Sequence, residues 1–132
     1  MEITCRHDIL PEVTQIIEVY NSSGINRPTK DSKRIKKMFE NSNLVVTTWD
    51  KERLVGISRT LTDFCYSCYV SDLAVHKQYQ KMGIGKGLLE YTKNVVGDKS
   101  NLLLLAAQPA MDYYPKVGFQ KVESAFIIKR LM

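Results

Sequence analysis

A short glycine-containing turn holds the residues whose types and spacing point most directly to chemistry. Gln80, Gly83 and Gly85 follow the pattern Gln-x-x-Gly-x-Gly, where a predicted strand leads into a predicted helix. The first turn of a helix carries backbone N–H groups without intrahelical acceptors, and the helix dipole adds partial positive charge there. Because glycine has no Cβ, a bulky anion can approach those groups closely. The pattern therefore predicts a phosphate-binding turn. Three lysines flank it: Lys77, Lys81 and Lys86.

The turn does not match the best-known nucleotide-binding signatures. It lacks the Gly-Lys-Ser/Thr ending of a P-loop, which argues against a nucleoside triphosphatase. It also lacks the third glycine of the dinucleotide-binding fingerprint. A lone Gly-x-Gly is a weak signal, and a glycine-rich turn with a purely structural role is the alternative.

The cysteines suggest a second kind of chemistry. Cys65 and Cys68 form a Cys-x-x-Cys pair, a spacing found in redox and zinc sites. A structural zinc site takes four ligands, but the chain has no second pair, and its two histidines, His7 and His76, lie far apart. We expect unpaired, reduced thiols and no metal. An odd count of three cysteines also favours a reducing compartment such as the cytoplasm.

The charge balance is mildly basic. The sequence has 19 Lys+Arg against 14 Asp+Glu, a net charge of +5, which suits nucleic acid, an anionic membrane surface or an anionic small molecule. The densest basic run, residues 30–37, shares its segment with an apolar stripe of helical spacing, so we interpret it as a solvated helix face. The longest uncharged apolar run, residues 102–107, is far shorter than the roughly 20 residues that cross a bilayer. The first residues lack the apolar stretch of a signal peptide.

The elements that must position the turn alternate along one predicted domain, residues 1–132. Strands are predicted at residues 3–6, 44–49, 53–62, 66–76, 101–107 and 126–131. Helices are predicted at residues 11–20, 31–41 and 84–96, with a short helical piece before Lys116. The continuous apolar run 101–107 predicts a strand buried on both faces. Residues 44–62 form a predicted antiparallel hairpin, whereas residues 70–107 are long enough for a crossover between parallel strands. We predict an α/β (α+β) fold with a mixed central sheet flanked by helices.

Two ordered motifs resemble those of the GCN5-related N-acetyltransferase (GNAT) superfamily. Residues 73–76, Leu-Ala-Val-His, and residues 80–89, Gln-Lys-Met-Gly-Ile-Gly-Lys-Gly-Leu-Leu, resemble motif A, which is Gln/Arg-x-x-Gly-x-Gly/Ala behind a Leu-Ala-Val-like strand. Residues 110–119, Ala-x-x-Tyr-Tyr-x-Lys-x-Gly-Phe, resemble motif B. A helix and an apolar strand separate the two motifs, as in the family. Each motif alone is of modest specificity, whereas the ordered pair is a strong indication.

The resemblance implies an acetyl-CoA site. In the family, backbone N–H groups of the motif A turn hold the pyrophosphate, and the preceding strand pairs with the pantetheine arm like an added strand. The strands that here hold Val75 and Leu104 would splay apart, so that the arm enters the wedge between them. The residues implied by position are Leu73, Ala74, Val75, Gln80, Lys81, Met82, Gly83, Ile84, Gly85 and Lys86.

The implied reaction is direct attack of an amine on the thioester. A backbone N–H such as that of Val75 would stabilise the oxyanion. Tyr114 matches the tyrosine that often protonates the departing thiolate, with the neighbouring Tyr113 as the alternative donor. Pro115 predicts a short or distorted helix at this point. Asp72 is a candidate for binding or deprotonating the amine; a salt-bridged structural carboxylate is the alternative reading, and a water chain is another candidate base.

The first helices and their loop usually line the acceptor pocket in this superfamily. Arg27 in that loop is a candidate partner for a substrate carboxylate, with an ordinary surface arginine as the alternative. We therefore predict a cytoplasmic, acetyl-CoA-dependent N-acetyltransferase that acts on the primary amine of a small metabolite or amino acid. We expect no nucleic-acid or membrane partner, and a homodimer is compatible with the resemblance. The alternatives are a protein or peptide N-acetyltransferase, a non-catalytic acyl-CoA sensor and a basic nucleic-acid-binding domain.

Overall fold

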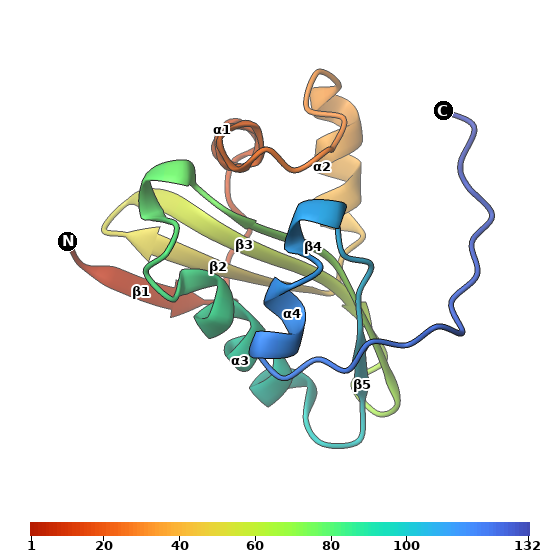
Figure 1. The fold of residues 1–132 in the computed structure, drawn as a ribbon. Helices are drawn as coiled ribbons and strands as arrows, with labels where there is room; N and C mark the ends of the chain where they lie inside the picture. The colour runs from red at the N-terminus through yellow and green to blue at the C-terminus, as the bar shows by residue number, and fades with distance from the viewer.

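A mixed five-stranded sheet runs through the middle of the computed structural model, which describes residues 1–132 (Figure 1). The strands are β1 (Ile3–Arg6), β2 (Leu44–Asp50), β3 (Arg53–Thr62), β4 (Ser67–Val75) and β5 (Asn101–Leu103), in that spatial order. The pairings from β1 to β4 are antiparallel, and β4 pairs with β5 in parallel. The predicted mixed sheet, its hairpin and its parallel crossover are thus confirmed.

Helices cover both faces of the sheet (Figure 1). α1 (Val13–Ser23) and α2 (Ser32–Glu40) lie on one face, and α3 (Ile84–Val96) lies on the other. Short helical turns complete the chain: η1 (Lys77–Tyr79), η2 (Gln108–Ala110) and α4 (Tyr113–Lys116). None of the helices is long and apolar enough to span a bilayer.

The core divides into two clusters, one on each face of the sheet. The cluster under α1 and α2 includes Ile16, Tyr20, Ile35 and Phe39 with the strand residues Trp49 and Ile57. The cluster under α3 includes Leu88, Leu89 and Val96 with Val46, Val55 and Val70. The alternation of inward and outward side chains along the strands produces this division, because successive residues point to opposite faces.

Local capping sets the predicted helix boundaries. At the start of α1, the Glu12 amide donates a hydrogen bond to Oε1 of Gln15, at 3.0 Å. Gly24 ends that helix in the left-handed conformation, with φ of 82°. The Asp31 side chain accepts a hydrogen bond from the Arg34 amide at the start of α2. Pro11, predicted in the first turn of α1, lies just before its N-cap instead.

α3 packs directly against the middle of the sheet at Gly56. A Cβ at this position would lie 3.0 Å from side-chain atoms of both Ile84 and Leu88. The absence of a side chain on β3 therefore lets the first turns of α3 approach the sheet closely. This contact fixes the start of α3 beside the end of β4.

Two predicted strands differ from the structure. The predicted strand at residues 101–107 is regular only from Asn101 to Leu103, and Leu103 and Leu105 are 46% and 56% exposed. The prediction of burial on both faces is wrong because β5 lies at the sheet edge and pairs only with β4. The predicted strand at residues 126–131 is also absent. This segment extends away from the body without a neighbouring strand to supply hydrogen bonds (Figure 1).

Candidate functional site

The parallel strands β4 and β5 pair only along the first three residues of β4. Their pairing covers Ser67 with Asn101, Cys68 with Leu102 and Tyr69 with Leu103, and stops there. β4 continues to Val75, so the later part of its edge on this side has no strand beside it. The structure thus has the predicted divergence of the strands that hold Val75 and Leu104. An exposed strand edge of this kind can pair with an extended polar ligand.

The turn that follows β4 is tied to the end of that strand. Gln80 donates a hydrogen bond from Nε2 to the carbonyl oxygen of Val75, at 3.0 Å. Lys81 and Gly83 then adopt positive φ values of 66° and 81°, and Gly83 is the N-cap of α3. A left-handed lysine is uncommon, so the turn is held in a conformation that the chain does not adopt by default. Gln80 therefore has a visible role in positioning the turn.

The turn presents unused backbone donors. Gly87 is the first residue of this region whose N–H meets a helical acceptor, the carbonyl of Gly83 at 2.9 Å. Ile84, Gly85 and Lys86 precede that bond and lack the acceptor that later helical residues have. The amides of residues 81–83 also have no acceptor in the chain. Together with the helix dipole, these donors give the turn the chemistry that an anion site requires.

The side chains of the turn divide into anchors and exposed groups. Ile84 is buried against the α3 core, whereas Met82 is 46% exposed. Lys77, Lys81 and Lys86 are exposed, and Lys86 makes only a long contact, 3.9 Å, with Glu90. The lysine ammonium groups are therefore available to an anion, while the buried Ile84 side chain holds the backbone of the turn in place.

On β4 itself, the two faces have different neighbours. Ala74 is buried in the cluster under α1 and α2, whereas Leu73 and Val75 are half-buried against the α3 cluster. On the α3 side, the predicted cofactor-binding strand thus presents the side chains of Leu73 and Val75, whereas the Ala74 side chain lies in the opposite layer.

Tyr113 lies against the first turn of α3. A Cβ added at Gly85 would lie 3.0 Å from the Tyr113 hydroxyl oxygen and 3.8 Å from Cγ2 of Val75. The end of β4, the start of α3 and α4 therefore meet at this glycine. Burial raises the pKa of the Tyr113 phenol, which keeps it protonated at neutral pH.

Tyr114 has different surroundings. Its ring packs between those of Tyr113 and Phe119, with centroid distances of 5.2 and 5.5 Å in edge-to-face geometry. Burial, followed by the neighbouring Tyr113, raises the pKa of Tyr114. Neither phenol has a hydrogen-bond partner in the chain, so both hydroxyls are free to donate. The predicted short helix at Pro115 is confirmed as α4.

Asp72 is part of a buried polar network. Its carboxylate accepts hydrogen bonds from the Tyr20 hydroxyl, from Nε of Arg27 and from Nε of Arg59, each at 2.6 Å, and from the Ser71 hydroxyl at 3.1 Å. Burial by itself would raise the pKa of Asp72, but the hydrogen bonds and the charge of Arg59, followed by Tyr20 and Arg27, outweigh it and lower the pKa. A carboxylate so fully occupied is a poor base. The structure therefore favours the structural alternative over the predicted catalytic or substrate role.

Arg27 is occupied in the same network. Besides Asp72, its guanidinium donates to the Ser71 carbonyl at 2.8 Å and to the Asn26 carbonyl at 2.7 Å. The side chain fastens the loop between α1 and α2 to β4. Its role in binding a substrate carboxylate stays a prediction. The sequence analysis missed the network partners Tyr20 and Arg59. The one sequence signal for this network is Arg59, a charged residue inside the otherwise largely uncharged strand β3.

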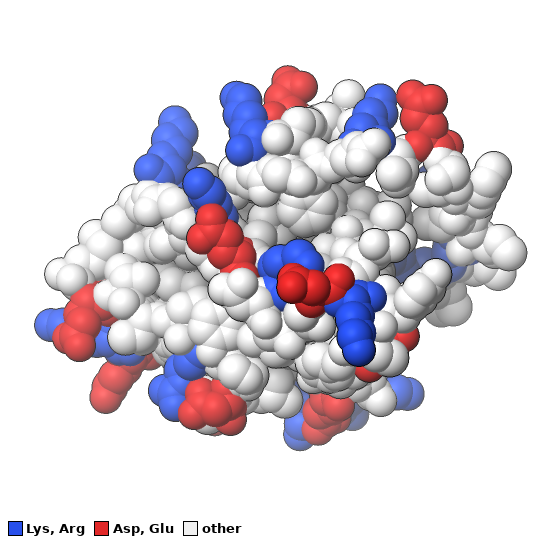
Figure 2. All heavy atoms as spheres, turned by 90° about the horizontal axis from the view of Figure 1, so that it is seen from below, with Lys and Arg blue, Asp and Glu red and all other residues white.

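Two other features have no part in this site. Cys65 is exposed in the β3–β4 turn and Cys68 is buried in the core, and all three cysteines are free. On the face shown in Figure 2, acidic and basic side chains are interspersed and do not gather into a patch of one sign. The basic residues of α2 lie on a helix whose apolar side, Ile35 and Phe39, is buried, as predicted for a solvated helix face.

Comparison with known proteins places this geometry in a family. Residues 16–131 match the family model described as the acetyltransferase (GNAT) domain. The chain therefore belongs to the GNAT family.

Individual relatives agree with this assignment. A ycf52-like uncharacterized N-acetyltransferase of Prochlorococcus marinus is 28% identical over 114 residues, which cover 82% of this chain and 62% of that protein. A solved structure described as a probable acetyltransferase of Staphylococcus aureus is 29% identical, with a TM-score of 0.79, and the match covers 98% of this chain and 100% of that one. An acetyltransferase of the GNAT family from Streptococcus pneumoniae shares the fold, with a TM-score of 0.78 at 20% identity and a match covering 98% of this chain and 99% of that one.

Proposed function

We propose that this domain transfers an acetyl group from acetyl-CoA to the primary amine of a small metabolite or amino acid. The observation that carries the proposal is the set of unused backbone donors at residues 81–86, which lies at the end of the strand whose neighbour diverges. An anion-binding turn and an open strand edge in this order match a diphosphate and an extended amide-containing arm.

The residues present fit acetyl-CoA. The amides of residues 81–86 would hold its diphosphate, with Lys81 and Lys86 adding charge, and the free edge of β4 at Leu73 and Val75 would pair with its pantetheine arm. When bound, acetyl-CoA supplies the acyl group in an activated form, as a thioester. Backbone N–H groups on the β4 edge, such as that of Val75, would orient the carbonyl oxygen and favour the negative charge that develops on it.

The direction of the arm selects between the two tyrosines. With the diphosphate at the start of α3, the arm runs along β4 from Val75 toward the point where β4 and β5 part. The Tyr113 hydroxyl lies against Gly85, at the diphosphate end. We therefore assign proton donation to the departing thiolate to Tyr114 and cofactor contact to Tyr113. A phenol with a raised pKa stays protonated and remains a donor at neutral pH.

Deprotonation of the amine is assigned to solvent water. Asp72 is the carboxylate that the sequence analysis considered as a base. Its oxygens already accept hydrogen bonds from Tyr20, Arg27 and Arg59. We place the reaction in the cytoplasm, since three free cysteines suit a reducing compartment.

A substrate screen tests the proposal. The protein is incubated with acetyl-CoA and pools of amino acids, polyamines, amino sugars and peptides, free thiol is followed over time, and products are identified by mass spectrometry. We expect thiol release with a small-amine pool and a product heavier by one acetyl group. Acetylation of peptides alone would move the acceptor class to proteins. Calorimetric binding of CoA without transfer to any pool would instead identify an acyl-CoA sensor.

A further inference from the structure

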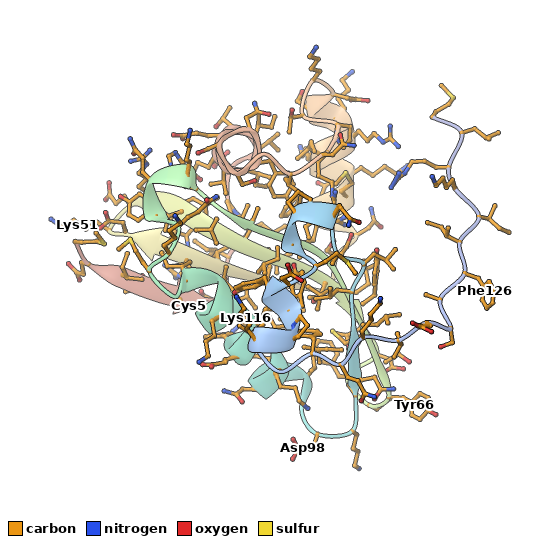
Figure 3. All side chains as sticks on the ribbon, in the orientation of Figure 1. Cys5, Lys51, Tyr66, Asp98, Lys116 and Phe126 are labelled. Atoms are coloured by element: carbon orange, nitrogen blue, oxygen red, sulfur yellow. The ribbon has the colours of Figure 1, made fainter.

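A cluster of charged and polar side chains holds the segment that connects β4 to the glycine turn, residues 80–86. His76 and Tyr79 of this segment are only 7% and 8% exposed. The Tyr79 hydroxyl donates to Oδ2 of Asp50 at 2.6 Å, and Cζ of Arg53 lies 5.6 Å from the centroid of the Tyr79 ring. Asp50 and Arg53 flank the tip of the β2–β3 hairpin, and Figure 3 shows Lys51 at that tip, on the side of the molecule where the chain leaves β4. The hairpin therefore clamps the segment that leads to the glycine turn.

His76 lies at the centre of this cluster, and both of its ring nitrogens face N–H donors. Nδ1 accepts a hydrogen bond from the Gln78 amide at 3.2 Å, which makes His76 the N-cap of η1. Nε2 lies 3.0 Å from Nη2 of Arg53, whereas the carboxylate of Glu18 on α1 is 3.9 Å away. A neutral imidazole can accept from one of these donors, but an imidazolium can accept from neither. Burial, followed by the charge of Arg53, lowers the pKa of His76 against a smaller opposing effect of Glu18.

The segment that His76 caps is short and is fastened on two sides. The His76 amide donates to the Val55 carbonyl of β3 at 2.8 Å, and the Lys77 amide donates to the Ser22 hydroxyl of α1 at 2.9 Å. η1 has only three residues, and Gln80, which starts the glycine turn, follows it directly. A change at the N-cap of η1 therefore reaches the turn through very few residues, and the first of its left-handed residues, Lys81, comes next in the chain.

We propose that His76 is a positioning residue for the glycine turn, so that its neutral ring holds η1 and the turn in place and its protonation releases them. An imidazolium gives up the Gln78 amide, repels the Arg53 guanidinium and is drawn toward Glu18. The charged and titratable groups that face the ring are Arg53 of β3, Glu18 of α1 and Tyr79 of η1, whose ring is 6.0 Å from that of His76.

The direction of the pH dependence follows from the pKa of His76. Because the folded pKa lies below the ordinary value of about 6.5, the neutral ring and its contacts are present at neutral pH. They are lost as the pH falls through the folded pKa. The backbone donors of residues 81–86 depend on the shape of the turn, so an anion bound there should be held less tightly below this pH. That last step rests on the proposed function, whereas the link between His76 and the turn does not.

The first test needs no ligand. In the protein alone, the ring signals of His76 and the backbone amide signals of Gly83 and Gly85 are followed by NMR from about pH 8 to about pH 5, the range in which histidine titrates. We expect the amides to move with the midpoint of the His76 ring. His76→Asn keeps a side-chain acceptor at the N-cap but does not titrate, so these movements should disappear. His7→Asn removes the only other histidine and should leave them unchanged. Amides that do not follow the ring overturn the proposal.

Two charge variants sharpen this test, because they act on His76 in opposite directions. Glu18→Gln removes the carboxylate that favours the imidazolium and should move the midpoint to lower pH. Arg53→Gln removes the charge that opposes the imidazolium and should move the midpoint to higher pH. The amide signals of Gly83 and Gly85 should shift together with the ring in both variants. A ring midpoint that moves while the amides stay would show that the turn does not respond to His76, and would overturn the proposal.

The second test joins the cluster to the proposed function. The Kd for CoA is measured by calorimetry in the wild type and in His76→Asn, at neutral pH and in mild acid. We expect the Kd to rise in acid by about fivefold more in the wild type, since a ligand that prefers one protonation state loses affinity as that state empties. The phosphates of CoA titrate in the same range, so the difference between the two proteins is the result that counts. An equal rise in both overturns the proposal. A protein that binds no CoA at any pH overturns the proposed function instead, and the ligand-free titration then decides the role of His76.

Discussion

Two polar regions, one within β4 and one just beyond its end, differ in how their hydrogen-bonding groups are used. At Asp72, in the middle of the strand, the buried carboxylate has a donor from α1, from the α1–α2 loop and from β3. At residues 81–86, just beyond the end of the strand, consecutive backbone donors have no acceptor at all. A satisfied buried network holds elements together, whereas an unsatisfied row of donors is available to a ligand. The comparison supports a structural role for the first region and the proposed binding role for the second.

Removing the Asp72 carboxylate from its satisfied network should have the largest effect, which is on the stability of the fold. Asp72→Ala leaves Arg27 and Arg59 without their shared partner, and the side chain of Arg59 is only 10% exposed. We expect a loss of about 3–5 kcal/mol in the free energy of unfolding, measured by urea denaturation, because an uncompensated buried charge is costly. Asp8→Asn, which breaks an exposed pair with Arg6, is the control and should leave the unfolding midpoint unchanged. A small effect of Asp72→Ala would remove the structural assignment.

Changing the proposed proton donor should affect turnover rather than folding. Tyr114→Phe keeps the ring packing against Phe119 and removes only the free hydroxyl. We expect kcat to fall by about 10² or more, with the Kd for CoA unchanged, since general acids contribute on that scale. Steady-state kinetics with the acceptor amine that the screen identifies measures the change in kcat. Tyr113→Phe is the matched variant and should act mainly on the affinity for CoA. The reverse pattern would exchange the two assignments.

Filling the space at the anion-binding turn should weaken binding without removing it. Gly85→Ala places a Cβ 3.0 Å from the Tyr113 hydroxyl oxygen, so the Tyr113 side chain must move slightly. We expect the Kd for CoA to rise about tenfold, equivalent to roughly 1.4 kcal/mol, in isothermal titration calorimetry. Gly87 lies two residues further along the same helix, and a Cβ there meets no atom within 4 Å. Gly87→Ala should therefore leave the affinity for CoA unchanged and slightly stabilise α3. Equal effects of the two variants would count against a specific site at Gly85.

The smallest effect concerns a satisfied carboxylate outside both regions. Asp63 accepts backbone hydrogen bonds from Cys65, Tyr66 and Ser67, which lower its pKa to about 2. Because the folded pKa lies below the ordinary value of about 3.9, this contribution is present above pH 4 and is lost as the pH falls toward 2. A carboxyl titration followed by NMR should show the low midpoint. Asp63→Asn retains the acceptor and should flatten the stability profile in that window; an ordinary midpoint would contradict the geometry.

The parts that sequence analysis predicts well are those fixed by local signals. The helices α1 and α2 and the β2–β3 hairpin follow from apolar spacing and from capping residues such as Asp31 and Gly24. The glycine turn before α3 was also predictable, because its glycines and the following helix are contiguous in the chain. Its binding of an anion stays a prediction. The resemblance to the GNAT family added the strand edge, which no local pattern indicates.

The parts that the sequence did not reveal depend on distant partners. In the Asp72 network, Arg59 and Tyr20 lie 13 and 52 positions from Asp72, and no spacing rule connects Tyr20 with Asp72. The edge position of β5 follows from the order of strands in the sheet and not from its apolar run. The strand predicted at residues 126–131 is absent for the same reason, since a strand depends on a distant neighbour and none lies beside this segment.

The sole tryptophan of the sequence, Trp49, lies in the core cluster beneath α1 and α2, where its indole N–H donates to the Thr47 hydroxyl at 2.8 Å. Its fluorescence should therefore be blue-shifted in the native protein and should move to longer wavelength when that layer opens. The anion-binding turn belongs to the opposite layer. Intrinsic emission is thus a built-in optical reporter of denaturation for every variant above, recorded without a label.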